Sequence, residues 1–275
     1  MVVVNRAIIT ATLFTLGACA SAPPEGGAAS AAASAYAGKS VLDTAIAAAG
    51  GEAALAQVKE IEWTGTATIT AEGKTTVVEV ATVVRPATNW ARSTSWVKAD
   101  GPKKARTLQA EQGKAWRVDR VTWTPLPEAQ AVHENQQFGL YKLMLLTPLK
   151  DLAARVTEAP AGADGTRAIK AMLPNGMGGE LEFDTAGKLM RVGLVVRDPA
   201  GGARDIVETV AFSGEIVSNG VKWPKRITIA QNGAPYFDLE IATFEANATI
   251  KPRPLPHTLD DGQPPPQQAK PADAG

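Results

Sequence analysis

The chain has 275 residues, and its 28 Lys and Arg side chains are balanced by 28 Asp and Glu side chains. This balance argues against nucleic acid as a partner and against a polybasic membrane-surface protein, because both need a cationic surplus on one face. The single cysteine excludes an intrachain disulfide framework and a Cys-rich metal site. The length allows one domain of roughly 200 residues with a sizeable core.

Residues 1–18 are typical of a secretory signal peptide. Arg6 supplies the positive charge, and residues 7–16 form an apolar run shorter than the ~20 residues of a transmembrane helix. The run ends in Leu-Gly-Ala followed by Cys19, which resembles the bacterial lipobox. The resemblance implies that Cys19 is lipidated, becomes the mature N-terminus and holds a lipoprotein firmly through several acyl chains. An ordinary signal peptide with an incidental cysteine is the alternative.

The residue after the cysteine bears on the destination. In Gram-negative lipoproteins an Asp there usually signals retention in the inner membrane, so Ala20 indicates the periplasmic face of the outer membrane. Residues 19–38 are mostly Ala, Ser, Gly and Pro, which predicts a flexible tether, and the Pro-rich residues 251–275 predict a disordered tail. The folded domain is therefore expected over residues 39–250.

Hydrophobic periodicity predicts a mainly β (α+β) domain. Apolar residues at helical spacing predict a helix from Ser40 that Gly50-Gly51 stops, and a second helix is expected from Pro127 to about Leu146. From Ile61 onward the period is two, and glycine-bearing turns separate further strand-like runs. These patterns favour a strongly curved antiparallel sheet, an incomplete β-barrel of about 10–11 strands covered by one or two helices.

Three phrases resemble periplasmic proteins of the LolA/LolB (outer-membrane lipoprotein-sorting-like) family. They are residues 48–59 with the Gly65-bearing first strand, residues 181–189, and residues 219–227 with the hairpin that follows. The resemblance covers roughly residues 40–250 and implies a helix-covered half-barrel whose apolar cavity takes acyl chains or similar ligands. The lipobox makes the chain closer in kind to the anchored LolB than to LolA, although no counterpart of LolB's exposed apolar loop is found.

The third phrase also resembles the leading domain of some periplasmic metallo-β-lactamase-fold hydrolases. In this chain the Pro-rich tail stands where the hydrolase domain would begin, so this resemblance lends no activity. A stand-alone accessory domain of that kind remains an alternative.

No catalytic, metal or cofactor site is predicted. His133-Glu134 lacks the second histidine of the H-E-x-x-H zinc motif, because Gln137 takes its place, and a polar histidine on the wet part of a helix is the simpler interpretation. Glu180 and Glu182 share one strand face and are expected in solvent. No Gly-x-Ser-x-Gly elbow is present, and the only other histidine, His257, lies in the predicted tail.

Aromatic and flexible apolar residues are the better candidates for a binding site. Aromatic rings supply large apolar area with a defined shape, and methionine adapts to variable acyl chains. The predicted cavity and lid residues are Trp63, Trp96, Trp116, Phe138, Leu140 and Met144. Ordinary core packing is the alternative for each of them.

The expected function is a membrane-anchored, non-catalytic lipoprotein that binds an acyl chain, lipid or lipoprotein segment. Its protein partner is unknown. A barrel filled by its own side chains, serving as an interaction module of the cell envelope, is the main alternative.

Overall fold

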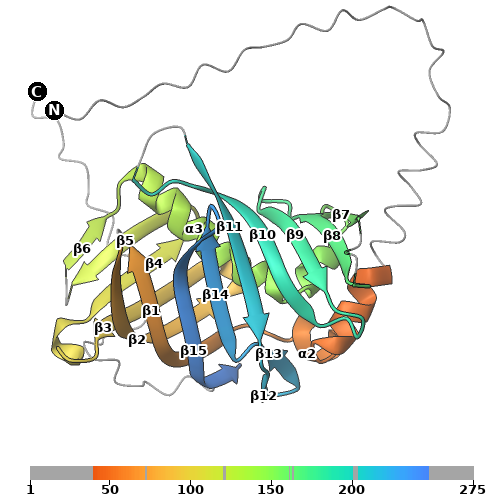
Figure 1. The fold of residues 1–275 in the computed structure, drawn as a ribbon, viewed down its shortest axis with the longest axis horizontal. Coiled ribbons are helices and arrows are strands. Elements are labelled where there is room, and N and C mark those ends of the chain that lie inside the picture. The colour runs from red at the N-terminus through yellow and green to blue at the C-terminus, as the bar shows by residue number, and fades with distance from the viewer. Residues whose placement is uncertain are drawn as a thin grey trace, which may run out of the picture.

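The computed structural model describes residues 40–71, 73–119, 122–160, 162, 164–200 and 204–247. Cys19, Ala20, His257, and the predicted signal peptide, tether and tail lie outside these residues, so the lipid anchor and the domain limits stay predictions. The described part is one long antiparallel sheet curled around a central helix (Figure 1).

The helices fall close to where periodicity places them. Residues 40–48 are helical and end before Gly50 and Gly51, both of which have positive φ. Helix α2 covers Glu52–Ala56, and the long helix α3 covers Glu128–Met144. Three short 3-10 turns complete the helical structure: η1 (Pro86–Thr88), η2 (Pro102–Lys104) and η3 (Thr147–Lys150).

The main sheet has 13 strands in the order β6-β5-β4-β3-β2-β1-β15-β14-β11-β10-β9-β8-β7. Their bounds are β1 (Ile61–Ala71), β2 (Lys74–Arg85), β3 (Trp90–Val97), β4 (Arg106–Glu111), β5 (Lys114–Asp119), β6 (Thr122–Pro125), β7 (Arg155–Ala159), β8 (Arg167–Met172), β9 (Gly178–Phe183), β10 (Leu189–Arg197), β11 (Asp205–Ser213), β14 (Arg226–Gln231) and β15 (Ala234–Ala246). A separate hairpin pairs β12 (Ile216–Ser218) with β13 (Val221–Trp223).

The curved antiparallel sheet is confirmed, with 13 strands where 10–11 were expected. The additional strands are β6, β7 and β8, which have 4, 5 and 6 residues. Runs as short as β6 and β7 give too few alternations to stand out from loops. β8 is as long as β9 and β14 and was nevertheless not identified. The turn glycines behave as predicted, since Gly101, Gly113, Gly176, Gly187, Gly220 and Gly233 all have positive φ.

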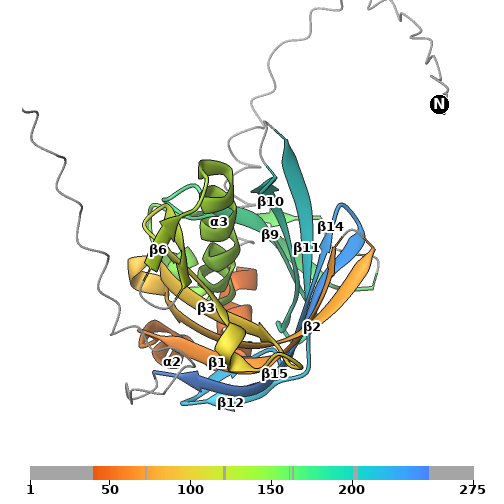
Figure 2. The ribbon, with the colours of Figure 1, turned by 90° about the vertical axis from the view of Figure 1, so that its left-hand side faces the viewer.

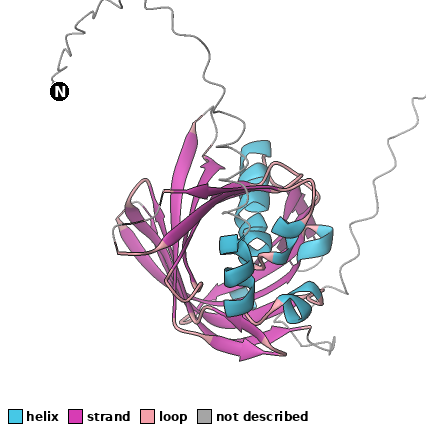
Figure 3. Ribbon diagram, turned by 90° about the vertical axis from the view of Figure 1, so that its right-hand side faces the viewer, coloured by secondary structure: helices cyan, strands magenta, loops and turns pink. Residues whose placement is uncertain are grey.

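The middle of the sheet is the pair β1–β15, which joins the strands of the first half of the chain to those of the second. The register of this pair shifts between Thr64 and Gly65, as at a β-bulge. A bulge bends its strand and increases the local twist. The bend helps the sheet to curl into the ring of strands seen end-on in Figure 3, with the helices along one side.

Helix α3 fills the open side of this curled sheet. Figure 2 shows it between the β3–β6 end of the sheet and the β9–β10 region. Its inward residues include Leu140, Leu143 and Met144, which are buried in the main core. On the side toward β4 and β5 the contact is made by small residues, with Ala131 packed against Ala110 and Ala115.

The interior beside α3 holds an aromatic cluster. The ring of Trp63 lies 4.7 Å from that of Tyr141 and 6.4 Å from that of Trp223, and Trp223 stacks on Phe244 at 5.4 Å. Trp63 and Trp223 are 2% and 3% exposed. Where the resemblance implies an apolar cavity, this part of the interior is packed with the protein's own rings.

Candidate functional site

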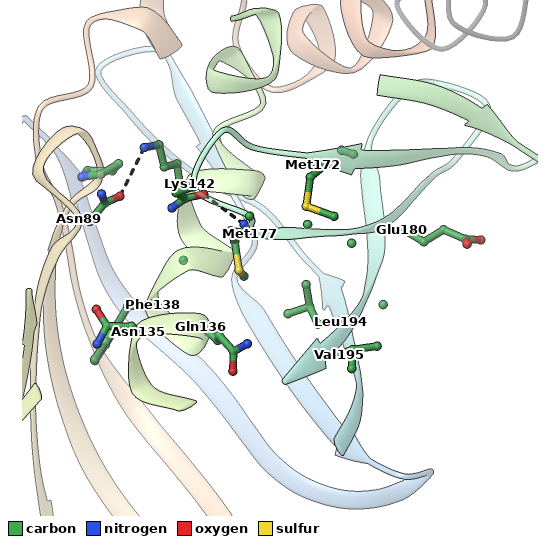
Figure 4. Close-up of a pocket in the computed structure, with 18 of the residues that line it drawn as sticks. Asn89, Asn135, Gln136, Phe138, Lys142, Met172, Met177, Glu180, Leu194 and Val195 are labelled. Carbon is green, nitrogen blue, oxygen red and sulfur yellow. Dashed lines mark hydrogen bonds between the residues drawn. The ribbon is translucent and has the colours of Figure 1, made fainter. Parts of the chain in front are cut away.

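A groove of about 1000 Å³ lies on the open side of the curled sheet. This seam groove crosses the outer face of α3, between loops of the β2–β5 region and the β8–β9 hairpin. Ligand sites for small molecules commonly have volumes of roughly 300–1,000 Å³. Figure 4 shows its lining, to which α3 contributes Val132, Asn135, Gln136, Phe138, Gly139 and Lys142.

The floor of the seam groove exists because α3 is buried on one face and open on the other. Val132, Gln136 and Gly139 recur at three- and four-residue spacing, so they share one face of the helix. Gly139 has no side chain, and a Cβ there would lie 3.2 Å from Met177 Sδ. The β8–β9 hairpin therefore approaches the helix closely at this point.

One wall is made by β9 and β10, which separate from each other. Their ladder ends at the pair Glu180–Gly193, although β10 continues to Arg197. Side chains of α3 satisfy the end of this free edge: the Arg197 N–H donates to Gln136 Oε1 at 2.7 Å, and His133 Nδ1 donates to the Arg197 carbonyl oxygen at 2.7 Å. The helix thus takes the place of a neighbouring strand.

Three glycines leave this part of the wall with few side chains. Gly178, Gly179 and Gly193 all line the groove there. Beyond them the groove reaches the outer face of the sheet, where Val195 is 62% and Val207 55% exposed. The apolar surface of the groove is therefore continuous with an exposed apolar patch.

The opposite wall is held by amide side chains. Asn135 Oδ1 accepts from the Gly113 N–H at 3.1 Å, and its Nδ2 donates to the carbonyls of Lys114 and Ala131 at 3.0 and 2.8 Å. Lys142 Nζ donates to Asn89 Oδ1 at 3.3 Å, across the groove mouth (Figure 4). These bonds fix the β2–β3 and β4–β5 connections to α3.

The charged residues on the far side of the groove are paired. Lys170 Nζ lies 4.0 Å from Glu180, and an Arg191 guanidinium nitrogen lies 3.5 Å from Glu182. Both glutamates line the groove and are partly exposed, whereas the sequence predicted that they face solvent. They lie on one strand, so they are not opposed across the groove as a pair of catalytic carboxylates would be.

Polar side chains also meet in the interior, where Gln137 of α3 contacts Glu208 of β11. Glu208 is fully buried, and its two oxygens accept hydrogen bonds from Gln137 and Gln231, at 2.5 and 2.9 Å. Burial raises the pKa of Glu134, the charge of His133 lowers it, and the charge of Glu208 raises it further. Burial, together with the charge of Glu134, also raises the pKa of Tyr141. The interior therefore disfavours additional negative charge.

The structure places the predicted binding residues at different sites. Phe138 lines the seam groove. Core packing, the alternative given for these residues, applies to Trp63, Leu140 and Met144, which are buried in the main core. Met144 also borders a small pocket of about 50 Å³.

Trp96 and Trp116 face away from α3. Their strand neighbours Val97 and Ala115 stand on the inward face, since Val97 pairs with the core residue Val78 and Ala115 packs on α3, and successive side chains alternate. Trp116 instead packs edge to face on Trp123, at 6.1 Å. Neither tryptophan lines the groove. Both were predicted as cavity residues because period-two alternation separates the two faces of a strand without showing which face turns inward.

His133 was wrongly expected on the wet part of the helix, since it is 4% exposed and bonded to the edge of β10. The groove residues that sequence reasoning missed are mainly Met177, Leu194 and Lys142. The Asn175-Gly176 turn signal was the one available indication that a hairpin ends near α3. Its contact with Gly139 depends on long-range packing.

No group of three or more His, Cys, Asp or Glu within metal-binding reach occurs among the described residues. In the same part of the chain, no helix combines the length and apolarity needed to cross a bilayer.

Comparisons with known proteins yield likeness at the level of fold. No family model matches the chain, and no curated protein sequence matches it. A solved structure described as an outer membrane lipoprotein-sorting protein domain, from Vibrio parahaemolyticus, has a TM-score of 0.52 at 6% identity, covering 79% of this chain and 95% of its own. A DUF1329 family protein from Desulfovibrio piger has a TM-score of 0.51 at 8% identity, covering 78% and 95%.

A LolA superfamily protein from Nitrosomonas europaea has a TM-score of 0.49 at 8% identity, covering 76% of this chain and 93% of its own. The expected LolA/LolB-like fold, an unclosed and mainly antiparallel barrel with few helices, is confirmed. At these identities the likeness concerns the fold alone.

Proposed function

We propose that this protein is a lipoprotein, anchored through Cys19 to the periplasmic face of the outer membrane, that binds the acyl chain of a lipid or of a lipoprotein segment without catalysis. The observation on which this proposal rests is the seam groove, an open volume of about 1000 Å³ with an apolar floor at Phe138, Met177 and Leu194. Burying an acyl chain there contributes about 0.8 kcal/mol per methylene.

The groove replaces the half-barrel interior as the binding site. The interior beside α3 is occupied by aromatic rings and by buried carboxylates, whereas the groove is lined mainly by apolar side chains and glycines. The fold likeness to a domain described as lipoprotein-sorting is consistent with an acyl ligand. The absence of catalysis is part of the proposal, and in the described chain His133 is buried with its Nδ1 engaged by a backbone carbonyl.

A groove-filling variant tests the proposal. Val132 lines the groove on α3, and Val217 is 57% exposed on β12 outside it. We expect Val132→Trp to weaken binding of hexadecanoate or a synthetic lipopeptide by about tenfold or more, because the indole occupies the space of several methylenes. Val217→Trp is the matched control and should leave the affinity unchanged.

The readouts are a fluorescence titration and mass spectrometry of lipid that co-purifies with the full chain. Absence of any bound lipid and of any response to either ligand would contradict the proposal. Anchoring is tested separately, since Cys19→Ser should release the protein from the membrane fraction.

An interaction module of the cell envelope is the second candidate. It is favoured by the packed aromatic interior and by exposed Met172, Val195 and Val207 on the outer sheet face. If the groove binds no lipid while substitutions in this patch abolish association with another envelope protein, this second function holds.

A further inference from the structure

The charges along the seam groove are unequally compensated. Of the three cationic side chains in its described lining, Lys170 and Arg191 are paired with groove glutamates. Lys142 forms no ion pair in the part of the chain that the structure covers, and its ammonium group contacts the neutral amide oxygen of Asn89. The groove therefore has one positive charge without a carboxylate partner.

Lys142 stands where the head group of a bound amphiphile would lie. It follows Phe138 by four residues and Gly139 by three, so all three share one side of α3. Figure 4 shows Lys142 and Asn89 at the edge of the groove and Phe138 and Met177 lower along it. A chain lying on Phe138 and Met177 thus ends beside the ammonium group.

Asn89 supplies a second donor at the same place. Its Oδ1 accepts the hydrogen bond from Lys142, and its Nδ2 has no partner among the described residues. An ammonium and an amide N–H together match an oxyanion, and charge-assisted hydrogen bonds of this kind are about twice as strong as neutral ones. The carboxylates of the interior, Glu134 and Glu208, are not part of the groove lining.

We infer that the seam groove selects amphiphiles with an anionic head group, a carboxylate or a phosphate monoester attached to the acyl chain, and that Lys142 determines this selectivity. The inference rests on the proposed function. The alternative is a purely structural role for Lys142, because a cation in the last turn of a helix stabilises the helix dipole. That role changes stability and leaves ligand preference untouched, so the two are separable by measurement.

The experiment compares four probes on the full chain: hexadecanoate, hexadecanol, hexadecyltrimethylammonium and inorganic phosphate. We expect hexadecanoate to bind about tenfold more tightly than hexadecanol, the preference to weaken as salt rises from about 0.05 to 0.5 M, and phosphate alone not to bind. Lys142→Met should abolish the preference. Lys142→Arg should retain it, and Lys170→Met, which removes a paired cation of the same groove, should leave it intact.

Each outcome decides between distinct conclusions. Equal binding of the anionic, neutral and cationic chains, or a preference that survives in Lys142→Met, overturns the inference and leaves acyl binding standing. Inorganic phosphate binding as tightly as hexadecanoate also overturns it, because the site would then recognise a free anion. If no chain binds, the proposed function fails together with this inference. Should Lys142→Met not fold, the salt dependence of the wild type and the Lys142→Arg variant still decide.

Discussion

Replacing Gly65 with alanine is expected to disrupt the centre of the sheet. Gly65 lies at the register shift of β1 on β15 and has no positive φ, so backbone conformation alone would tolerate alanine. An added Cβ, however, would lie 2.2 Å from the Glu240 carbonyl oxygen and 3.1 Å from Ile241 Cα. Carbon–oxygen contacts between strands normally measure about 3.3–3.6 Å. The two strands would have to part by about 1 Å.

The size of the effect follows from that displacement. A shift of about 1 Å takes a backbone hydrogen bond beyond its useful range, and each bond lost costs about 1 kcal/mol. Overpacking adds about 1–3 kcal/mol. With two bonds lost, we expect Gly65→Ala to lower the free energy of unfolding by about 3–5 kcal/mol and Tm by roughly 6–20 °C.

Gly193→Ala is the matched control, because Gly193 is also a strand glycine and its Cβ would meet only the Glu180 oxygen at 4.0 Å. Alanine there should be neutral or slightly stabilising, by up to about 1 kcal/mol. Urea unfolding followed by tryptophan fluorescence measures both variants. If Gly65→Ala loses less than about 1 kcal/mol, the close approach of β15 is not what requires glycine, and the reasoning is wrong.

Two further predictions concern α3. Burial, with the neighbouring Glu208, raises the pKa of Glu134 above 4.5, so the folded protein binds that proton more tightly than the unfolded chain. This carboxyl should therefore destabilise the folded protein at neutral pH, and the destabilisation should decrease as pH falls toward 4.5. The Glu134→Gln variant should be more stable than the wild type at neutral pH, and this difference should shrink on acidification. Thermal unfolding measured across pH tests the prediction. The Asn135→Ala variant loses three hydrogen bonds to the backbone, so its free energy of unfolding should fall by about 1–3 kcal/mol. Amide exchange at Gly113 should accelerate, and unchanged exchange would contradict the view that Asn135 holds the β4–β5 turn against α3.

Local patterns predicted much of the fold. The period of two in residues 61–70 and the helical spacing after Pro127 depend only on each segment's own residues, and both elements form there. The curvature of the sheet was also predicted, from the small number of helices and the large number of hairpins. The short strands β6 and β7 were missed because their alternation is brief.

The site was less predictable because it depends on contacts between distant segments. Phe138 was found, since its helix was recognised, but Met177 reaches α3 only through the folding of the β8–β9 hairpin. Trp63 was predicted as a cavity residue, and its ring is indeed buried, but its contacts with Tyr141 and Trp223 cannot be predicted from the sequence of the strand itself. Alternation identifies a face and leaves open whether that face borders a cavity or a neighbouring ring.

The pairing of β1 with β15 also has a kinetic consequence. Thr64 and Thr243, whose hydroxyl groups are 2.7 Å apart, are separated by 179 residues along the chain. Most other strand pairs are hairpins that can zip up locally, whereas this central ladder must wait until both chain segments have been synthesised and have met. Such non-local pairing slows folding. Until that step is complete, β1 and β15 each present an unpaired edge to which other chains could attach.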